Sequence, residues 1–130
     1  MSNTVSEIMT TPVLTVDPAT NLDEIADAML AEEIKSIAAI DEDCNPVGIL
    51  TSTDFIEVVS NGHAGSDHTV REYMTTELVT AEQGISIPEA AARMVEHGIS
   101  HLPVTDGSGV IGIVTATDIA DYVGSEQIDT

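Results

Sequence analysis

The pattern of hydrophobic and polar residues alternates between short apolar runs and helical periodicity, and the same order of the two patterns occurs twice along the chain. Short apolar runs predict strands at 13–16, 37–40 and 47–51, and again at 78–80, 102–105 and 110–115. Apolar residues at helical spacing predict helices at 22–32 and 87–97, the first with Leu22, Ile25, Ala26, Met29 and Leu30 as its stripe. Shorter helices are predicted at 54–60 and 118–123. Each half of the chain is therefore predicted as β-α-β-β-α.

The ends of the longer helices carry the expected signals. Asn21 stands just before the first helix. Ser86 and Glu89 form a capping box with a proline inside the first turn of the second helix, and Gly98 marks its end. The stretches 41–46 and 106–109 between the paired strands have the composition of turns.

The chain contains an internal repeat. Val-Ser-Glu-Ile-Met-Thr-Thr at 5–11 reappears as Val-Arg-Glu-Tyr-Met-Thr-Thr at 70–76, and Gly-Ile-Leu-Thr-Ser-Thr-Asp at 48–54 reappears as Gly-Ile-Val-Thr-Ala-Thr-Asp at 112–118. We expect repeats at 5–60 and 70–124 and a linker at 61–69. Because a repeat of this size buries its own sheet poorly, the predicted fold is α+β, with two repeats packed sheet to sheet in pseudo-twofold symmetry.

Charge excludes two classes of partner. The 130 residues include 23 acidic and 3 basic ones, so the formal net charge is −20. Lys35, Arg71 and Arg93 are too few to neutralise the phosphates of a nucleic acid or an anionic membrane surface. A hydrophobic content of 42% and a mean hydropathy of +0.14 argue against disorder.

The acidic residues are spread along the whole chain rather than gathered in a tail. Repulsion among about twenty uncompensated charges opposes folding at low ionic strength, and about 1 M salt screens most of it. This composition is similar to that of cytosolic proteins from salt-accumulating halophiles; an acidic mesophilic protein is the alternative interpretation.

Other features favour a cytoplasmic protein. No apolar run approaches the roughly 20 residues that span a bilayer, and the first residues do not form a secretory signal. The single cysteine, Cys44, fits a reducing compartment.

The strongest candidate chemistry lies where the last strand of each repeat meets the following helix. Thr51, Thr53 and Asp54 occupy this turn in the first repeat. A carboxylate there can accept hydrogen bonds from two ribose hydroxyls, and threonine hydroxyls can bind sugar or phosphate. The same spacing is also that of an ordinary helix-capping box, and both interpretations remain open.

These motifs resemble tandem cystathionine-β-synthase (CBS) domains over most of the chain. The resemblance rests on the Met-Thr turn, on His-Leu-Pro-Val-Thr-Asp at 101–106, and on the doubled Gly-Ile-(Leu/Val)-Thr-x-Thr-Asp segment. It implies a Bateman module of the stand-alone, haloarchaeal-like type that forms a homodimer and regulates an effector protein on a separate chain. Such modules require no cofactor and bind AMP, ADP, ATP, S-adenosylmethionine or methylthioadenosine in clefts between the repeats.

The resemblance also assigns ligand-binding roles. Residues expected to contact ribose or phosphate are Thr51, Thr53, Asp54, Thr115, Thr117 and Asp118. Residues expected near the phosphate at the start of the second strand are Lys35, Ser36, Ser100 and His101. Residues expected to line or flank the base are Val13, Leu14, Ile34, Leu78, Val79 and Ile99. Lys35 can equally be a solvated lysine at a helix end, and His101 an ordinary strand residue.

We expect neither catalysis nor a metal site. His63, Asp67 and His68 in the linker match no defined metal-ligand spacing, and no Ser-His-Asp or Cys-His arrangement is recognisable. Two functions remain: a regulatory module that senses adenosine-containing metabolites, or a structural and partner-docking module whose clefts are vestigial.

Overall fold

The chain folds into two compact units. The computed structural model describes residues 3–11, 13–65 and 67–128. One unit comprises Leu14–Leu78, and the other comprises Met1–Val13 together with Val79–Thr130. We call them the first-repeat unit and the second-repeat unit.

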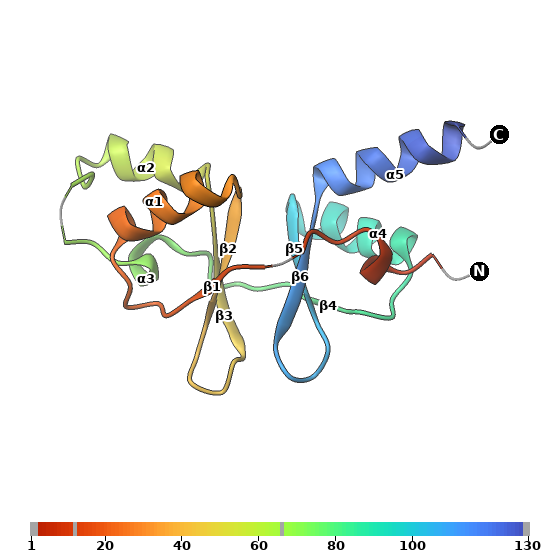
Figure 1. Cartoon of the computed structure of the whole chain (residues 1–130), viewed down its shortest axis with the longest axis horizontal. Coiled ribbons are helices and arrows are strands. Elements are labelled where there is room, and N and C mark those ends of the chain that lie inside the picture. The colour runs from red at the N-terminus through yellow and green to blue at the C-terminus, as the bar shows by residue number, and fades with distance from the viewer. Residues whose placement is uncertain (1–2, 12, 66, 129–130) are drawn as a thin grey trace. The chain divides into compact units, whose positions relative to one another are not determined.

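The first-repeat unit is a three-stranded sheet covered by helices. Its elements are β1 (Thr15–Val16), α1 (Leu22–Glu32), β2 (Ser36–Ile40), β3 (Pro46–Thr51), α2 (Asp54–Ser60) and α3 (Val70–Tyr73). The strand order is β1-β2-β3, with β1 parallel to β2 and β2 antiparallel to β3. Both α1 and α2 lie on one face of this sheet (Figure 1).

The second-repeat unit has the same plan. Its elements are η1 (Val5–Glu7), β4 (Ala81–Glu82), α4 (Ile87–His97), β5 (His101–Thr105), β6 (Val110–Thr115) and α5 (Ala116–Ile128). The strand order is β4-β5-β6, again with a parallel and an antiparallel pair. The predicted α+β class with a repeated β-α-β-β-α order is confirmed. Within the described ranges, every helix is too short or too polar to cross a membrane.

The strand predicted at 78–80 is wrong, because β4 comprises Ala81–Glu82, and a proline accounts for the absence of Thr80 from it. In the first-repeat unit, the backbone N–H of Ala38 donates to the carbonyl of Leu14 at 3.2 Å. The equivalent position in the second repeat is Pro103, which has no N–H and cannot hold residue 79 in the same way. Pairing therefore starts at Ala81 with Val104. The first predicted strand, 13–16, is also shorter and covers only Thr15–Val16.

The last helix is longer than the 118–123 that the pattern predicts. It starts at Ala116, directly after β6, and continues to Ile128. The carbonyl of Ser100 accepts a hydrogen bond from the Ala116 N–H at 3.1 Å, which fixes the point where strand becomes helix. Gly124 lowers the helical propensity, yet the helix passes through it.

The two long helices begin and end as predicted. Asn21 accepts from the Asp23 N–H at 2.8 Å, Ser86 accepts from the Glu89 N–H at 3.2 Å, and Gly98 adopts a left-handed φ of 62°. Leu30 does not belong to the buried stripe, because its side chain is 78% exposed. The buried residues of α1 are Leu22, Ile25 and Met29.

Each core is completed by a segment from the neighbouring repeat in the sequence. Val70 is fully buried against α1, β2 and β3, and its N–H donates to the Thr20 carbonyl. Val5 is likewise buried in the core of the second-repeat unit, and its N–H donates to the Ile85 carbonyl. The turn at 5–11 thus packs on the second-repeat unit, although the strand that follows it, β1, belongs to the first-repeat unit. The turn at 70–76 packs on the first-repeat unit, although β4 belongs to the second-repeat unit.

A methionine and a glycine fix each of these turns. Met74 lies on Gly48 of β3, and Met9 lies on Gly112 of β6. A Cβ atom at Gly48 would overlap the Met74 sulfur and would lie 2.7 Å from its Cγ. Backbone hydrogen bonds join the same segments, between Thr75 and Ile49 and between Thr10 and Ile113. Glycine is therefore required by close approach rather than by backbone conformation.

The linker packs on the first-repeat unit through histidines. The rings of His63 and His68 stack with centroids 3.7 Å apart, and His63 Nδ1 lies 2.7 Å from the Tyr73 hydroxyl. His68 Nδ1 lies 2.8 Å from a Glu72 carboxylate oxygen. The hydrogen bonds from His68 and from the Thr69 N–H lower the pKa of Glu72. The linker therefore contributes to holding α3 in place.

We expect Gly48→Ala to destabilise the protein by about 1–3 kcal/mol, because the added methyl group overlaps Met74. In a Met74→Ala background, where Cγ and sulfur are gone, the same substitution should cost much less. Urea unfolding of the four proteins measures the coupling. Gly84→Ala, with no atom within 4 Å of the added Cβ, is the control. An equal cost of Gly48→Ala in both backgrounds would refute the role assigned to this contact.

Candidate functional site

The structure gathers the polar residues predicted in the first repeat at one end of β2 and β3. We call Lys35, Ser36, Thr51, Thr53 and Asp54 the first half-site. Ser36 is paired with Thr51 in the antiparallel ladder, and the Lys35 carbonyl accepts from the Ser52 N–H at 2.9 Å. The start of β2 and the end of β3 are thus held side by side, as the candidate site requires.

Asp54 is held by the end of β3. Its Oδ2 accepts from the Thr51 N–H at 2.7 Å and lies 3.3 Å from the Thr51 hydroxyl, which also lies 2.8 Å from the Thr53 hydroxyl. Asp54 is half-buried and Thr53 is exposed. The Thr53 side chain makes no capping bond to α2. Among the described residues, Asp54 Oδ1 has no hydrogen-bond donor, so this oxygen can accept one from a ligand.

The second half-site has the same backbone frame. It consists of Ser100, His101, Thr115, Thr117 and Asp118. His101 is paired with Thr115, and the Ser100 hydroxyl lies 3.1 Å from His101 Nδ1. Asp118 Oδ2 accepts from the Thr115 N–H at 2.9 Å, and the Asp118 N–H donates to the Thr115 hydroxyl at 3.2 Å. This reciprocal pair is a complete capping box, which the first half-site lacks.

Thr10 distinguishes the two half-sites, and sequence reasoning missed it. Its hydroxyl lies 3.1 Å from Asp118 Oδ1 and 3.0 Å from Oδ2. Both carboxylate oxygens of Asp118 therefore have a hydroxyl partner, as a sugar hydroxyl would supply. Thr75 is the equivalent of Thr10, and no hydrogen bond joins its described side chain to Asp54. The Met-Thr turn marked the repeat, but nothing in it indicated a contact with Asp118.

The apolar residues that were predicted to line the adenine base are divided between the two units. Leu14 and Ile34 are half-buried against the core of the first-repeat unit, and Val79 and Ile99 against that of the second. Val13 and Leu78 are half-buried, but each belongs to the unit of the other repeat. Leu14, Ile34, Val79 and Ile99 are therefore structural as they stand, and their ligand-binding role remains a prediction.

The half-sites contain one lysine and one histidine, and no arginine. Lys35, in the first half-site, is exposed, and His101 is the corresponding group of the second. Arg93 binds the Thr80 carbonyl at 2.8 Å and lies 3.4 Å from Glu89. Within residues 3–11, 13–65 and 67–128, no three His, Cys, Asp or Glu side chains form a group that could hold a metal ion. The half-sites suit a sugar better than a polyphosphate.

We expect Thr10→Val to destabilise the protein by about 0.5–1.5 kcal/mol, because Asp118 loses a hydroxyl donor. Thr75→Val is the matched control and should change the free energy of unfolding by less than about 0.5 kcal/mol. Chemical denaturation at neutral pH measures both. Equal effects of the two substitutions would show that the difference between the half-sites has no energetic weight.

The comparisons with known proteins agree with this architecture. The family model described as "CBS domain" matches residues 5–61 and 70–125. An uncharacterised protein of Methanopyrus kandleri, MK0525, is 37% identical over 91% of this chain, which spans 61% of that relative's length. The CBS domain-containing protein YhcV of Bacillus subtilis is 32% identical over 91% of this chain and 84% of its own length.

Solved structures give the same result. The CBS domain pair of protein MJ0100, in complex with 5′-methylthioadenosine and S-adenosyl-L-methionine, superposes with a TM-score of 0.87 and 28% identity, covering 97% of this chain and 99% of that one. The matched segments carry both half-sites. With two matched repeats and the fold of a solved pair, this chain belongs to the CBS domain family and contains a tandem CBS module.

Proposed function

We propose that this chain is a regulatory module that binds adenosine-containing metabolites and catalyses no reaction. The observation that carries the proposal is the doubled Thr-x-Thr-Asp turn, which places Asp54 and Asp118 at the ends of β3 and β6. The related MJ0100 pair was solved with two adenosyl ligands, which supports this ligand class. The threonine hydroxyls and carboxylates would hold the sugar, and the half-buried aliphatic residues would contact the base.

The charges favour ligands without a polyphosphate. The protein has a net charge of −20, and Lys35 is the only lysine or arginine of the two half-sites. A triphosphate would meet mainly repulsion, whereas methylthioadenosine is neutral and S-adenosylmethionine carries a sulfonium cation. We therefore propose methylthioadenosine or S-adenosylmethionine as the preferred ligand, ahead of AMP, ADP and ATP.

The two half-sites should differ in affinity. Asp54 Oδ1 is available to a ribose hydroxyl, whereas a ligand at Asp118 must displace the Thr10 hydroxyl from both oxygens. Displacing one hydroxyl by another returns little free energy. Asp54 should therefore contribute more than Asp118 to binding of the first equivalent of ligand.

One observation favours the second candidate function, a structural and partner-docking module. The complete capping box at Asp118, closed by Thr10, is a satisfied arrangement without any ligand. In this alternative both carboxylates stabilise helix starts, and the module acts through its surfaces alone. Ligand titration separates the two functions.

We propose a homodimer and a separate effector as partners. Apolar side chains are exposed at Leu30 (78%) and Ile56 (71%), and Val95, the equivalent of Leu30, is 82% exposed. A twofold dimer buries the same surface patch on both copies, so exposed apolar side chains such as these are candidates for its interface. Sedimentation equilibrium at several concentrations should give twice the mass of 13.6 kDa, and Ile56→Glu should lower it.

Isothermal titration in concentrated KCl tests the function. Methylthioadenosine and S-adenosylmethionine should bind more tightly than AMP, ADP and ATP. Asp54→Ala should weaken binding about 10- to 100-fold, because charge-assisted hydrogen bonds to the ribose are lost, and Asp118→Ala should weaken it less. Asp27→Ala, on the exposed side of α1, is the control. Absence of heat with all five ligands would leave the docking function.

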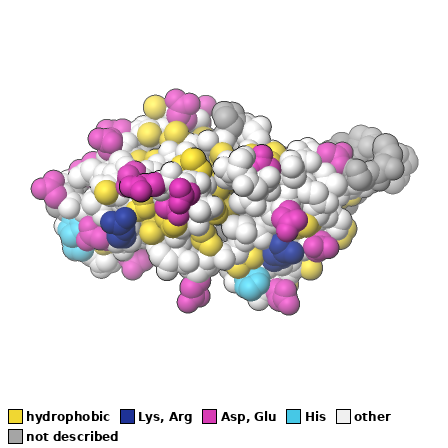
Figure 2. Space-filling model, turned by 90° about the horizontal axis from the view of Figure 1, so that it is seen from below, with side chains coloured by type: hydrophobic (Ala, Val, Ile, Leu, Met, Phe, Trp, Pro, Cys, Tyr) yellow, Lys and Arg dark blue, Asp and Glu magenta, His cyan; other side chains and the backbone are white. Residues whose placement is uncertain are grey.

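We propose further that the protein works in the cytosol of a salt-accumulating organism. Acidic side chains are scattered over the face in Figure 2 rather than gathered in one patch. The free energy of unfolding should therefore rise steeply between low salt and about 1 M KCl, where the Debye length is roughly 3 Å. Thermal unfolding at a series of KCl concentrations measures this. A midpoint independent of KCl would favour the mesophilic interpretation.

A further inference from the structure

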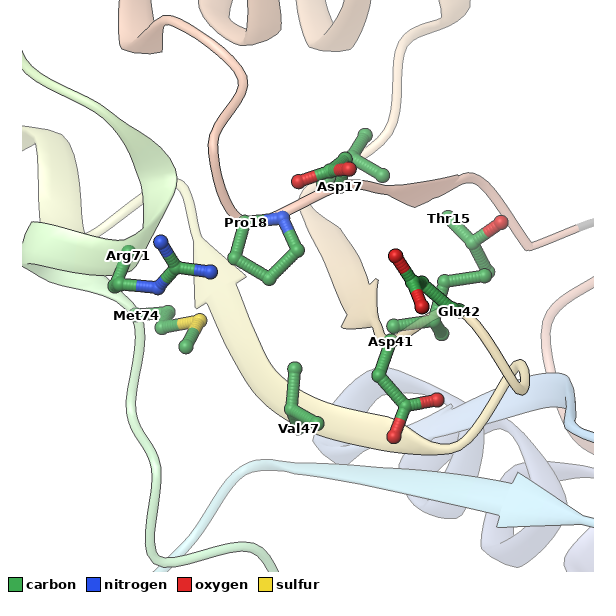
Figure 3. A pocket seen from close by; sticks show the side chains of 10 residues that line it. Thr15, Asp17, Pro18, Asp41, Glu42, Val47, Arg71 and Met74 are labelled. Carbon is green, nitrogen blue, oxygen red and sulfur yellow. The ribbon is translucent and has the colours of Figure 1, made fainter.

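A pocket of about 550 Å³ opens in the first-repeat unit, at the opposite end of the β2–β3 ladder from the first half-site. Its lining residues are Thr15, Val16, Asp17, Pro18, Ile40, Asp41, Glu42, Val47, Arg71 and Met74 (Figure 3). They come from the carboxyl ends of β1 and β2, the start of β3, and α3. Because Ser36 pairs with Thr51 at one end of the β2–β3 ladder and Ile40 with Pro46 at the other, the pocket and the half-site lie about four strand residues, or roughly 13 Å, apart.

The floor of the pocket is apolar and fixed. Pro18 is buried, and Val47 and Met74 are half-buried. Met74 is held against Gly48, and the Pro18 carbonyl accepts the Arg71 N–H at 2.9 Å. The floor is therefore set by the same packing that completes the core.

The rim of the pocket carries opposite charges on opposite sides. The Arg71 side chain extends from α3 beside Pro18, and Glu42 points into the pocket from the turn after β2, where Asp41 also lies (Figure 3). Within the described part of the chain, the Arg71 guanidinium forms neither a hydrogen bond nor an ion pair, although the protein carries 23 acidic residues. Asp41 Oδ1 is used by the N–H groups of its own turn, and Glu42 makes no hydrogen bond to a described residue.

The second repeat does not share this charge pattern. Met9 and Asp106 are the equivalents of Met74 and Asp41, but Ser6 replaces Arg71, Gln83 replaces Pro18 and Gly107 replaces Glu42. Residues that the fold requires, such as the methionines on the glycines, recur in both repeats. Arg71 and Glu42 do not recur, so the fold alone does not account for them.

We propose that this pocket binds a free basic amino acid such as lysine. The ligand carboxylate would form a bidentate pair with Arg71, the strongest geometry for that group. Its side-chain ammonium would meet Glu42 on the other side, and its methylene chain would lie on Pro18, Val47 and Met74. With Asp17, the lining carries three carboxylates and one guanidinium, a formal charge of −2 that favours a zwitterion with a net positive charge.

Four small molecules test the proposal by titration with the full chain in the KCl buffer used for the adenosyl ligands. Lysine should bind at least about tenfold more tightly than cadaverine, which lacks the carboxylate, and than norleucine, which lacks the side-chain ammonium. Glutamate should not bind. Equal affinities for lysine and cadaverine, or no heat with lysine, would overturn the proposal, whatever the adenosyl titration gives.

Variants then place the ligand. Arg71→Gln should weaken lysine binding about tenfold and leave cadaverine binding unchanged or tighter, whereas Glu42→Gln should weaken both. Arg93→Gln and Glu32→Gln, which remove the same charges elsewhere, are the controls. Arg71→Lys keeps the charge but loses the planar fork, and should recover part of the affinity. If Arg71→Gln binds lysine as the wild type does, while unfolding at the same temperature, the pocket is not the binding site.

Discussion

The packing of a methionine on a glycine of a sequence-distant strand is the contact on which the rest of the molecule depends. Met74 on Gly48 and Met9 on Gly112 bring the turns at 70–76 and 5–11 onto β3 and β6. With each turn comes a fully buried valine that completes a core. Cores of this size cannot lose such a residue without a large part of their stability. The sheets that carry the half-sites, and the pocket beside α3, are therefore built on this exchange.

The duplication left the backbone alike and let the side chains diverge. Both units hold the start of the second strand against the end of the third by equivalent hydrogen bonds, from Ser52 to Lys35 and from Ala116 to Ser100. On this common frame, Asp118 is closed by Thr10, whereas Asp54 keeps an open oxygen. Arg71 likewise stands opposite Glu42 in one unit only. A duplicated fold can thus carry two different chemistries, because the backbone does not depend on these side chains.

Sequence reasoning succeeded where the signal is local. The helical periodicity from Leu22 to Glu32, the cap at Ser86 and the left-handed Gly98 all depend on neighbours a few residues away. Sequence reasoning failed where the structure depends on a residue that is distant in the sequence. The strand near residue 80 is shifted by the missing N–H of Pro103, and the hydroxyl of Thr10 meets a carboxylate 108 residues away. Arg71 was seen only as one of three basic residues, because nothing in the sequence places it beside Pro18.

The exchange of turns also determines the order in which the two cores can fold while the chain is being synthesised. The segment 3–11 leaves the ribosome long before β6, the strand that it packs against, which ends at Thr115. At about 5–20 residues per second, that segment waits on the order of 5–20 s for its partner. The core of the first-repeat unit is complete as soon as α3 has emerged from the ribosome. This unit can therefore fold first, before the second repeat has been synthesised. A break in the linker would leave two fragments. The first would carry the turn at 5–11 that completes the second core, and the second would carry the turn at 70–76 that completes the first core, so the native cores would form only when the fragments associate.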